Sequence, residues 1–274
     1  MTEKTPIEHG SLEESMMMPL YAQALCAQRF GDLFPDPGAI EAIARADYDF
    51  GRFKLKDAAI LPQGLRNRIF ADQIREFLSH HPNGTVVDLG AGCDTFFPQV
   101  DNGTCRWVNI DSAESIDARN RLMPKRARQA DLAFSIFDPD WFSQVSADSD
   151  KGVLFIANGE LGYYQPSAVQ LLVVSIAEEF PGCQIVFDTV STGNMKRANK
   201  AAQKAGTSPI RFAVDDVQEL RSWDASITDA QDVGQVPSDV MGSKKLPLSV
   251  RIALFSGGSA GMTKVVRLQS RLAG

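Results

Sequence analysis

The sequence predicts an α/β protein built on a doubly wound, Rossmann-like, mostly parallel sheet. Strand patterns alternate with helical patterns from about residue 84 onward, and such alternation is typical of parallel sheets with right-handed crossovers. A strand that begins near Val86 runs directly into a glycine turn at Gly90 and Gly92. A second strand ends in Asp111, about 20 residues beyond Gly90, which is the spacing of nucleotide-binding sheets.

Helical segments are expected ahead of this sheet. Apolar residues recur at helical spacing over residues 11–30 and 39–46, and a Pro-Asp-Pro-Gly break separates the two segments. An amphipathic helix follows over residues 64–79. We therefore expect a helical N-terminal extension over residues 1–83 and a sheet domain over residues 84–274.

Five strands, the first near Val86, and the helices between them are expected in order along the sheet domain. The later strands are predicted at residues 105–110, 127–131, 152–157 and 184–190. The helices are predicted at residues 112–121, 140–145 and 167–180. Residues 262–269 form a further strand. Because the interval of residues 191–259 is too long for one crossover, we expect a cap or lid there.

The glycine turn suggests a nucleotide cofactor. Glycine adopts backbone angles that other residues avoid, and its missing Cβ lets the main chain approach a ligand closely. The dinucleotide fingerprint requires a third Gly or Ala three residues after the second glycine, where this chain has Thr95. This departure weakens the nicotinamide hypothesis. Asp111 is placed to accept from both ribose hydroxyls, and the alternative is that it caps the following helix.

Composition limits the classes of partner. The chain has 274 residues, is 44% hydrophobic and carries a net charge of −6, which argues against a general nucleic-acid or membrane-surface binder. No apolar run reaches the roughly 18 residues that span a bilayer, and the polar start lacks a signal-peptide core, so a cytoplasmic protein is expected. The four cysteines have no C-x-x-C pairing, and neither a metal site nor a disulfide framework is indicated.

Several motifs together resemble the leucine carboxyl methyltransferase superfamily. They lie at residues 85–95, 108–111, 131–132 and 157–164, and two further segments at 47–50 and 212–223 fit the same pattern. Within that superfamily, the chain is most similar to the tetracenomycin-type polyketide-synthesis O-methyltransferases. The resemblance implies a class I methyltransferase fold with a seven-stranded sheet, S-adenosylmethionine (SAM) as cofactor, and a C-terminal cap around residues 191–259.

The resemblance also implies which residues hold the cofactor. The glycine turn cradles SAM, Asp111 holds the ribose, and Asp131 with Leu132 meets the adenine. Either Arg66 or Arg68 binds the methionine carboxylate, for which a guanidinium fork is suited. The full expected set is Arg66, Asp88, Gly90, Ala91, Gly92, Asp111, Ser112, Asp131, Leu132 and Asn158.

One position departs from the family pattern. The family often has Glu-Gly after the fourth strand, where this chain has Asn158 and Gly159. An amide still accepts from the methionine ammonium but loses the ionic part of the contact. Glu160, two residues later, is a candidate for the missing charge. Together with Tyr163 and Tyr164 it is assigned to the substrate pocket, because ligands bind at the carboxyl ends of strands.

The acceptor of the methyl group is a small molecule, and the histidines favour a carboxylate. A phenol or alcohol must lose a proton, usually to a histidine, whereas a carboxylate is already ionised at neutral pH. His80 and His81 precede the first strand, at the opposite edge from the expected site, and His9 lies in a terminal arm. The alternatives are a hydroxyl acceptor, with Asp, Glu or Tyr as base, and a catalytically silent SAM-binding protein. The catalytic residue and the oligomeric state stay open.

Overall fold

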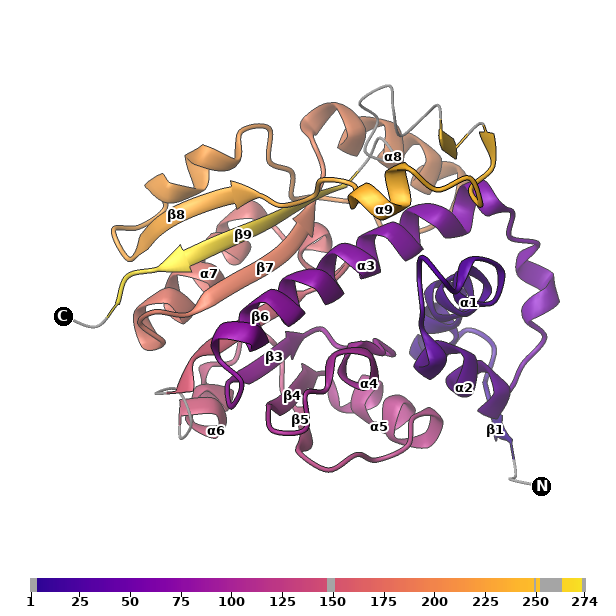
Figure 1. Ribbon diagram of the computed structural model, residues 1–274, viewed down its shortest axis with the longest axis horizontal. Helices are drawn as coiled ribbons and strands as arrows, with labels where there is room; N and C mark the ends of the chain where they lie inside the picture. The colour runs from indigo at the N-terminus through magenta and orange to yellow at the C-terminus, as the bar shows by residue number, and fades with distance from the viewer. Residues whose placement is uncertain (1–3, 147–150, 249, 252–262, 273–274) are drawn as a thin grey trace.

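The computed structural model describes residues 4–146, 151–248, 250–251 and 263–272. Its core is a seven-stranded sheet in the order β5-β4-β3-β6-β7-β9-β8, shown in Figure 1. The strands are β3 (Thr85–Leu89), β4 (Arg106–Asp111), β5 (Gln129–Ala133), β6 (Val153–Ala157), β7 (Gln184–Thr189), β8 (Ile227–Asp232) and β9 (Lys264–Ser270). Neighbours pair in parallel except β9, which is antiparallel to β7 and β8. The predicted fold class is confirmed.

Helices cover both faces of the sheet. They are α3 (Asp57–His80), α4 (Phe96–Val100), α5 (Ala113–Leu122), α6 (Phe142–Ser146) and α7 (Pro166–Glu179). On β3, Val87 packs in a cluster with α6 and α7, while the adjacent Val86 packs in a second cluster with α3 and α4. Side chains alternate between the two faces of a strand. Because both faces are covered, β6 is apolar and buried at every position.

The N-terminal extension is helical. It contains α1 (Leu12–Phe30) and α2 (Pro37–Arg45), with a two-stranded parallel pair of β1 (Thr5–Pro6) and β2 (Ala46–Asp47). Ser11 caps α1 by accepting from the backbone N–H of Glu14, as hydroxyl N-caps do. The first helix of the prediction therefore begins and ends where it was expected.

The third helix of the extension begins earlier than predicted. We expected it to start at Gly64, after Pro62, but α3 starts at Asp57 with Pro62 inside it. A proline in a helix removes one backbone hydrogen bond. The buried side chains of Ile60 and Leu61, which flank this point, offset the loss.

The interval predicted as a cap is partly sheet. It contains α8 (Thr192–Ala205), the edge strand β8 and α9 (Ser238–Met241). The sequence pattern missed β8 because an edge strand with polar residues at four of its six positions lacks the apolar run of a buried strand. Residues 252–259 of the interval lie outside the described residues. The division into an extension, a sheet domain and a cap stays a prediction.

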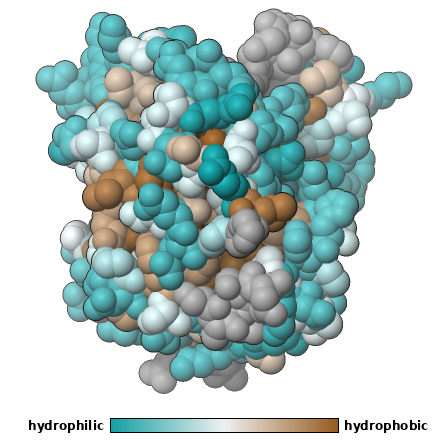
Figure 2. Space-filling model, turned by 90° about the vertical axis from the view of Figure 1, so that its left-hand side faces the viewer, coloured by the Kyte–Doolittle hydropathy of each residue, from teal (hydrophilic) through white to brown (hydrophobic). Residues whose placement is uncertain are grey.

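The surface is mainly polar. In the face shown in Figure 2, hydrophilic residues predominate and hydrophobic residues gather across the middle. The four cysteines are free and buried. Within the part of the chain that the structure describes, no helix is long and apolar enough to cross a membrane.

Candidate active site

The turn after β3 has the backbone that its glycines predict. Gly90 and Gly92 have φ angles of +70° and +40°, which residues with a Cβ rarely adopt. The N–H of Gly90 donates to the carbonyl of Ile110 at 2.8 Å, and that of Ala91 donates to the same oxygen at 3.3 Å. The turn is therefore fixed against the end of β4.

Asp111, the last residue of β4, joins the two strand ends. Its carboxylate accepts from the N–H of Gly92 at 2.8 Å and from the N–H of Ser112 at 2.7 Å. The capping alternative belongs to Ser112, whose hydroxyl accepts from the N–H of Ser115 at the start of α5. Because a carboxylate has roughly four acceptor sites, Asp111 keeps capacity for a ribose.

Two buried charged residues, Asp88 and Arg119, lie next to the turn. Asp88 is 1% exposed, and neither of its carboxylate oxygens has a partner among the described residues. Burial, reinforced by the charge of Asp94, raises the pKa of Asp88 well above its usual range. Arg119 of α5 donates to the carbonyls of Gly92 at 3.0 Å and Asp94 at 2.8 Å. Arg119 thus stabilises the turn by two hydrogen bonds. The sequence did not identify it as a site residue.

Asp131 and Leu132 lie on β5, next to β4. The Asp131 carboxylate accepts from the side-chain amide of Asn109 at 2.6 Å and lies 3.5 Å from Nε of Arg119. Leu132 is half-buried and packs against the core. These contacts hold Asp131 beside the Asp111 strand, and its contact with adenine stays a prediction.

A polar stripe on α3 reaches the ends of β6 and β7. Arg66 donates to Asp188 at 3.0 Å and to Gln63 at 2.9 Å. The other carboxylate oxygen of Asp188 accepts from the N–H of Gly159 at 2.5 Å. Arg66 therefore lies at the carboxyl ends of the strands, where the methionine carboxylate is expected.

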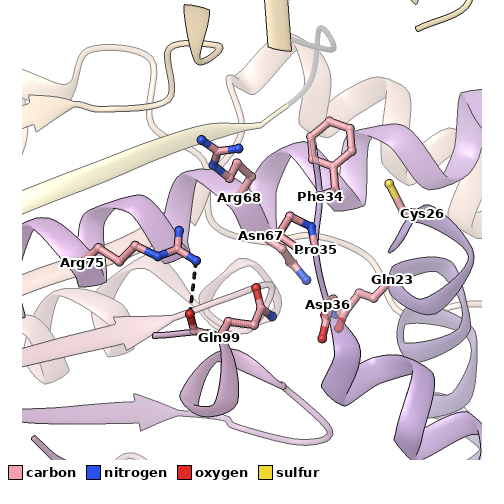
Figure 3. Close-up of a pocket in the computed structure, with 10 residues that line it drawn as sticks. Gln23, Cys26, Phe34, Pro35, Asp36, Asn67, Arg68, Arg75 and Gln99 are labelled. Atoms are coloured by element: carbon pink, nitrogen blue, oxygen red, sulfur yellow. Dashed lines mark hydrogen bonds between the residues drawn. The ribbon is translucent and has the colours of Figure 1, made fainter. Parts of the chain in front are cut away.

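Arg68, the alternative to Arg66, points elsewhere. It donates to Asp72 at 2.8 Å and to the carbonyl of Leu33 at 3.0 Å. Figure 3 shows Arg68 leaving α3 on the opposite side from Asn67. The cavity drawn there holds only about 20 Å³, room for one water molecule rather than a cofactor. Of the two arginines, Arg66 is the one that the fold brings to the strand ends.

Asn158, at the end of β6, is held by its side-chain amide, and its contact with the cofactor stays a prediction. Its side-chain N–H group lies 3.1 and 3.2 Å from the two carboxylate oxygens of Asp94 and 3.3 Å from Oδ1 of Asn67. The Oδ1 atom of Asn158 is buried and has no partner among the described residues. Burial raises the pKa of Asp94 to about 7, although the hydrogen bond from Asn158 lowers it.

Glu160 lies on the glycine turn. A Cβ placed on Gly90 would be 2.6 Å from Cδ and 2.9 Å from Oε2 of Glu160, so the side chain fills the space that glycine leaves. The hydroxyl of Tyr164 donates to Oε1 of Glu160. Burial raises the pKa of Glu160 to about 7, and the charges of Asp111 and Asp188 act in the same direction.

A cavity of about 120 Å³ opens beside these groups, at the carboxyl ends of β6 and β7. Tyr163 lines it and is 49% exposed, whereas Tyr164 packs against Phe137. The Thr189 hydroxyl is buried and has no partner among the described residues. The lining residues are Arg66, Gly159, Gly162, Tyr163, Asp188, Thr189, Val190, Ile210, Phe212 and Thr263.

The histidines lie away from this site. His9 contacts Glu14 and Arg52 at 2.9 Å, and its side chain is 73% exposed. His80 ends α3, and His81 lies beside Gly152, just before β6 begins. Both are therefore at the amino end of the sheet. The chain has three histidines, so none of them lies at the strand ends that carry Asp111 and Glu160.

Comparison with known proteins identifies a relative. No family model matches the chain. It is 27% identical over 182 residues to the tetracenomycin polyketide synthesis O-methyltransferase TcmP of Streptomyces glaucescens. The chain is a homologue of TcmP. The alignment covers 65% of this chain and 66% of TcmP, slightly less than two thirds of the length of that relative.

One solved structure with a TM-score above 0.5 shares the fold. A DUF574 family protein from Streptomyces avermitilis has a TM-score of 0.58 and 11% identity, and the match covers 92% of this chain and 97% of that one. Human N-acetylserotonin methyltransferase, in complex with SAM, has a TM-score of 0.48 and 12% identity over 93% of this chain and 72% of that one. The order of the seven strands in this chain, with only β9 antiparallel, is that of the class I methyltransferase fold.

Proposed function

We propose that this protein is a SAM-dependent O-methyltransferase that acts on a small-molecule acceptor. The observation that carries the proposal is the glycine turn of a TcmP homologue, joined to the end of β4 by the contact between Asp111 and Gly92. Positive φ angles at the turn let the main chain approach a ligand. Asp111 supplies acceptors for a ribose at the position where such sheets bind nucleotides.

The residues around the turn fit SAM. Arg66 presents a guanidinium for the methionine carboxylate, and the buried, unpaired Oδ1 of Asn158 is an acceptor for the ammonium. Asp131 and Leu132 lie beside Asp111 on the neighbouring strand for the adenine. When bound, SAM supplies an electrophilic methyl group on a sulfonium. The protein then has to align the acceptor oxygen and exclude water.

We propose a carboxylate as the acceptor group. A carboxylate with a pKa of about 4 is ionised at neutral pH and needs no base, and no histidine lies at the strand ends. The cavity beside Arg66 and Thr189 gives such an acceptor a place next to the glycine turn. Its wall includes the apolar side chains of Ile210 and Phe212, which suit the apolar part of such an acceptor.

A hydroxyl acceptor is the second candidate, and Glu160 favours it. With a pKa of about 7, this carboxyl is matched to accept a proton near neutral pH. Under this alternative, the rate of methyl transfer rises through pH 7 and the product is an ether. Under the carboxylate proposal, the rate at saturating SAM is nearly flat above neutral pH and the product is an ester.

Transfer of a labelled methyl group from SAM to a panel of aromatic acids and matched phenols tests the proposal. We expect a product whose label is released by mild base, as a methyl ester requires. A base-stable product would contradict the carboxylate acceptor. Binding of SAM without transfer to any member of the panel would instead support the catalytically silent protein.

A further inference from the structure

Glu160 is the carboxylate whose side chain rests directly on the glycine turn. Its Cδ and Oε2 fill the space beside Gly90, while the Tyr164 hydroxyl holds Oε1. Gly90 therefore allows the close approach of a carboxylate from the end of β6. A cation bound at this turn meets that carboxylate first.

The neighbouring acids are either held by other groups or enclosed in the core. Asp111 accepts from two backbone N–H groups, and Asp188 is paired with Arg66. Asp94 accepts from the amide of Asn158, and Asp88 is enclosed beneath the turn. A ligand at Gly90 can contact the carboxylate of Glu160 without breaking an ion pair and without opening the core. Glu160 differs in this from the other four acids.

A glutamate in place of Asn158 would be unfavourable. The amide of Asn158 donates to both oxygens of Asp94, so a carboxylate in its place would set two like charges about 3 Å apart. Asn158 nevertheless leaves its Oδ1 free. The site thus keeps a neutral acceptor at position 158 and a charged acceptor at position 160.

We propose that Glu160 makes the charged contact to the ammonium group of SAM, with Asn158 as its neutral companion. The proposal rests on the proposed function, because it names a contact of that same cofactor site. An ammonium carries three donors, and hydrogen bonds in which both groups are ionised are the strong ones. Glu160 is then a specificity residue for the amino-acid end of the cofactor.

Calorimetry with three ligands tests this assignment. SAM and S-adenosylhomocysteine both carry the ammonium, whereas 5′-methylthioadenosine lacks the amino-acid part. Glu160→Gln keeps the size of the side chain and an acceptor for Tyr164 but removes the charge. We expect it to weaken SAM and S-adenosylhomocysteine by about 10- to 100-fold each, the scale of hydrogen bonds to charged groups. We expect 5′-methylthioadenosine to change by less than about twofold.

Each other outcome overturns the assignment. Loss of SAM affinity alone would place Glu160 on the sulfonium, and an equal loss for all three ligands would show that it only shapes the turn. No loss would show that another group meets the ammonium. If the unaltered protein binds none of the three ligands, the proposed function itself fails.

Glu114→Gln is the matched control. Glu114 is an exposed carboxylate in the first turn of α5, so its removal changes the net charge by the same amount without touching the turn. We expect all three affinities to stay within about twofold. Thermal unfolding of the ligand-free variants shows whether each remains folded.

Discussion

Arg119 illustrates how one buried guanidinium holds a backbone turn. Its side chain is 4% exposed, and it donates to two carbonyls of the turn while lying near the carboxylate of Asp131. One terminal nitrogen, Nη1, donates to both carbonyls while Nε lies 3.5 Å from Asp131, and the shorter side chain of lysine, with its single ammonium, does not reproduce this arrangement. The conformation of Gly92 therefore depends on a residue of α5.

Arg119→Lys tests this role. The variant keeps the positive charge but leaves at least one carbonyl without its donor, so we expect the free energy of unfolding to fall by about 1–3 kcal/mol. The affinity for SAM is expected to fall as well, because the turn loses its brace. Urea denaturation and calorimetry measure the two effects. Unchanged values for both would show that the turn holds its shape without Arg119.

Contacts within one motif were predictable, and contacts between distant segments were not. The glycines and Asp111 follow a fixed local pattern, so their places at the turn were expected from sequence. Arg119 meets Gly92 from 27 residues away, and Arg66 meets Asp188 from 122 residues away. Nothing local to Arg119 distinguishes it from a solvated helix residue. For the same reason, the contact of the Glu160 side chain with Gly90 could not be predicted from sequence, and its assignment to the substrate pocket stays a prediction.

At the scale of elements, the crossing of α1 and α3 depends on a small residue. A Cβ on Gly64 would overlap Sγ of Cys26 and lie 3.3 Å from Cβ of Cys26 and Cγ of Phe34. Glycine lowers helix stability by about 1 kcal/mol relative to alanine. The crossing therefore keeps glycine in spite of helix propensity, because the two backbones approach closely there.

Gly64→Ala is expected to lower the melting temperature. Overpacking in a dense core costs about 1–3 kcal/mol, which exceeds the gain in helix propensity. Adding Cys26→Ala removes the overlapping sulfur, so the double variant is expected to regain most of the loss relative to Cys26→Ala alone. Circular dichroism on the three variants measures this coupling. Additive effects of the two changes would contradict direct contact across the crossing.

The elements that the sequence predicted share one property, and those it missed lack it. The buried strands and the long helices carry apolar patterns that persist over their whole length, as β6 and α7 do. The edge strand β8 is polar at four of its six positions, and Pro62 interrupts the pattern of α3. Their structure depends on partners elsewhere in the chain, which a local pattern does not contain.

At the scale of the whole molecule, buried acids link stability to pH. Burial raises the pKa of Asp36 to about 6 and those of Asp94 and Glu160 to about 7. A carboxyl whose pKa is raised by folding stabilises the folded state while it is protonated, and that contribution is lost as pH rises through the folded pKa. The ligand-free protein is therefore expected to be more stable near pH 6 than near pH 8.

Asp36→Asn separates one part of this effect. Asp36 caps α2 and accepts from the Thr95 hydroxyl, and an amide oxygen accepts in both places. Its pKa shift of about 2 units corresponds to about 3 kcal/mol, so the variant is expected to be stabilised at pH 8 and to show a weaker pH dependence. Denaturation at pH 4 and pH 8 measures both, because the contribution of Asp36 is lost between its unfolded pKa of about 4 and its folded pKa of about 6. If the free energy of unfolding depended on pH equally in the two proteins, the titration of Asp36 would not contribute to stability.

The antiparallel strand β9 has a consequence for synthesis on the ribosome. In the sheet, β9 lies between β7 and β8 and pairs with both. In the chain, β9 follows both of them. During synthesis, β7 and β8 emerge before β9. Until β9 is made, each of the two strands has an edge without its partner. Unpaired strand edges promote association with other chains. Both edges stay open to such association until residues 264–270 are available to pair with them.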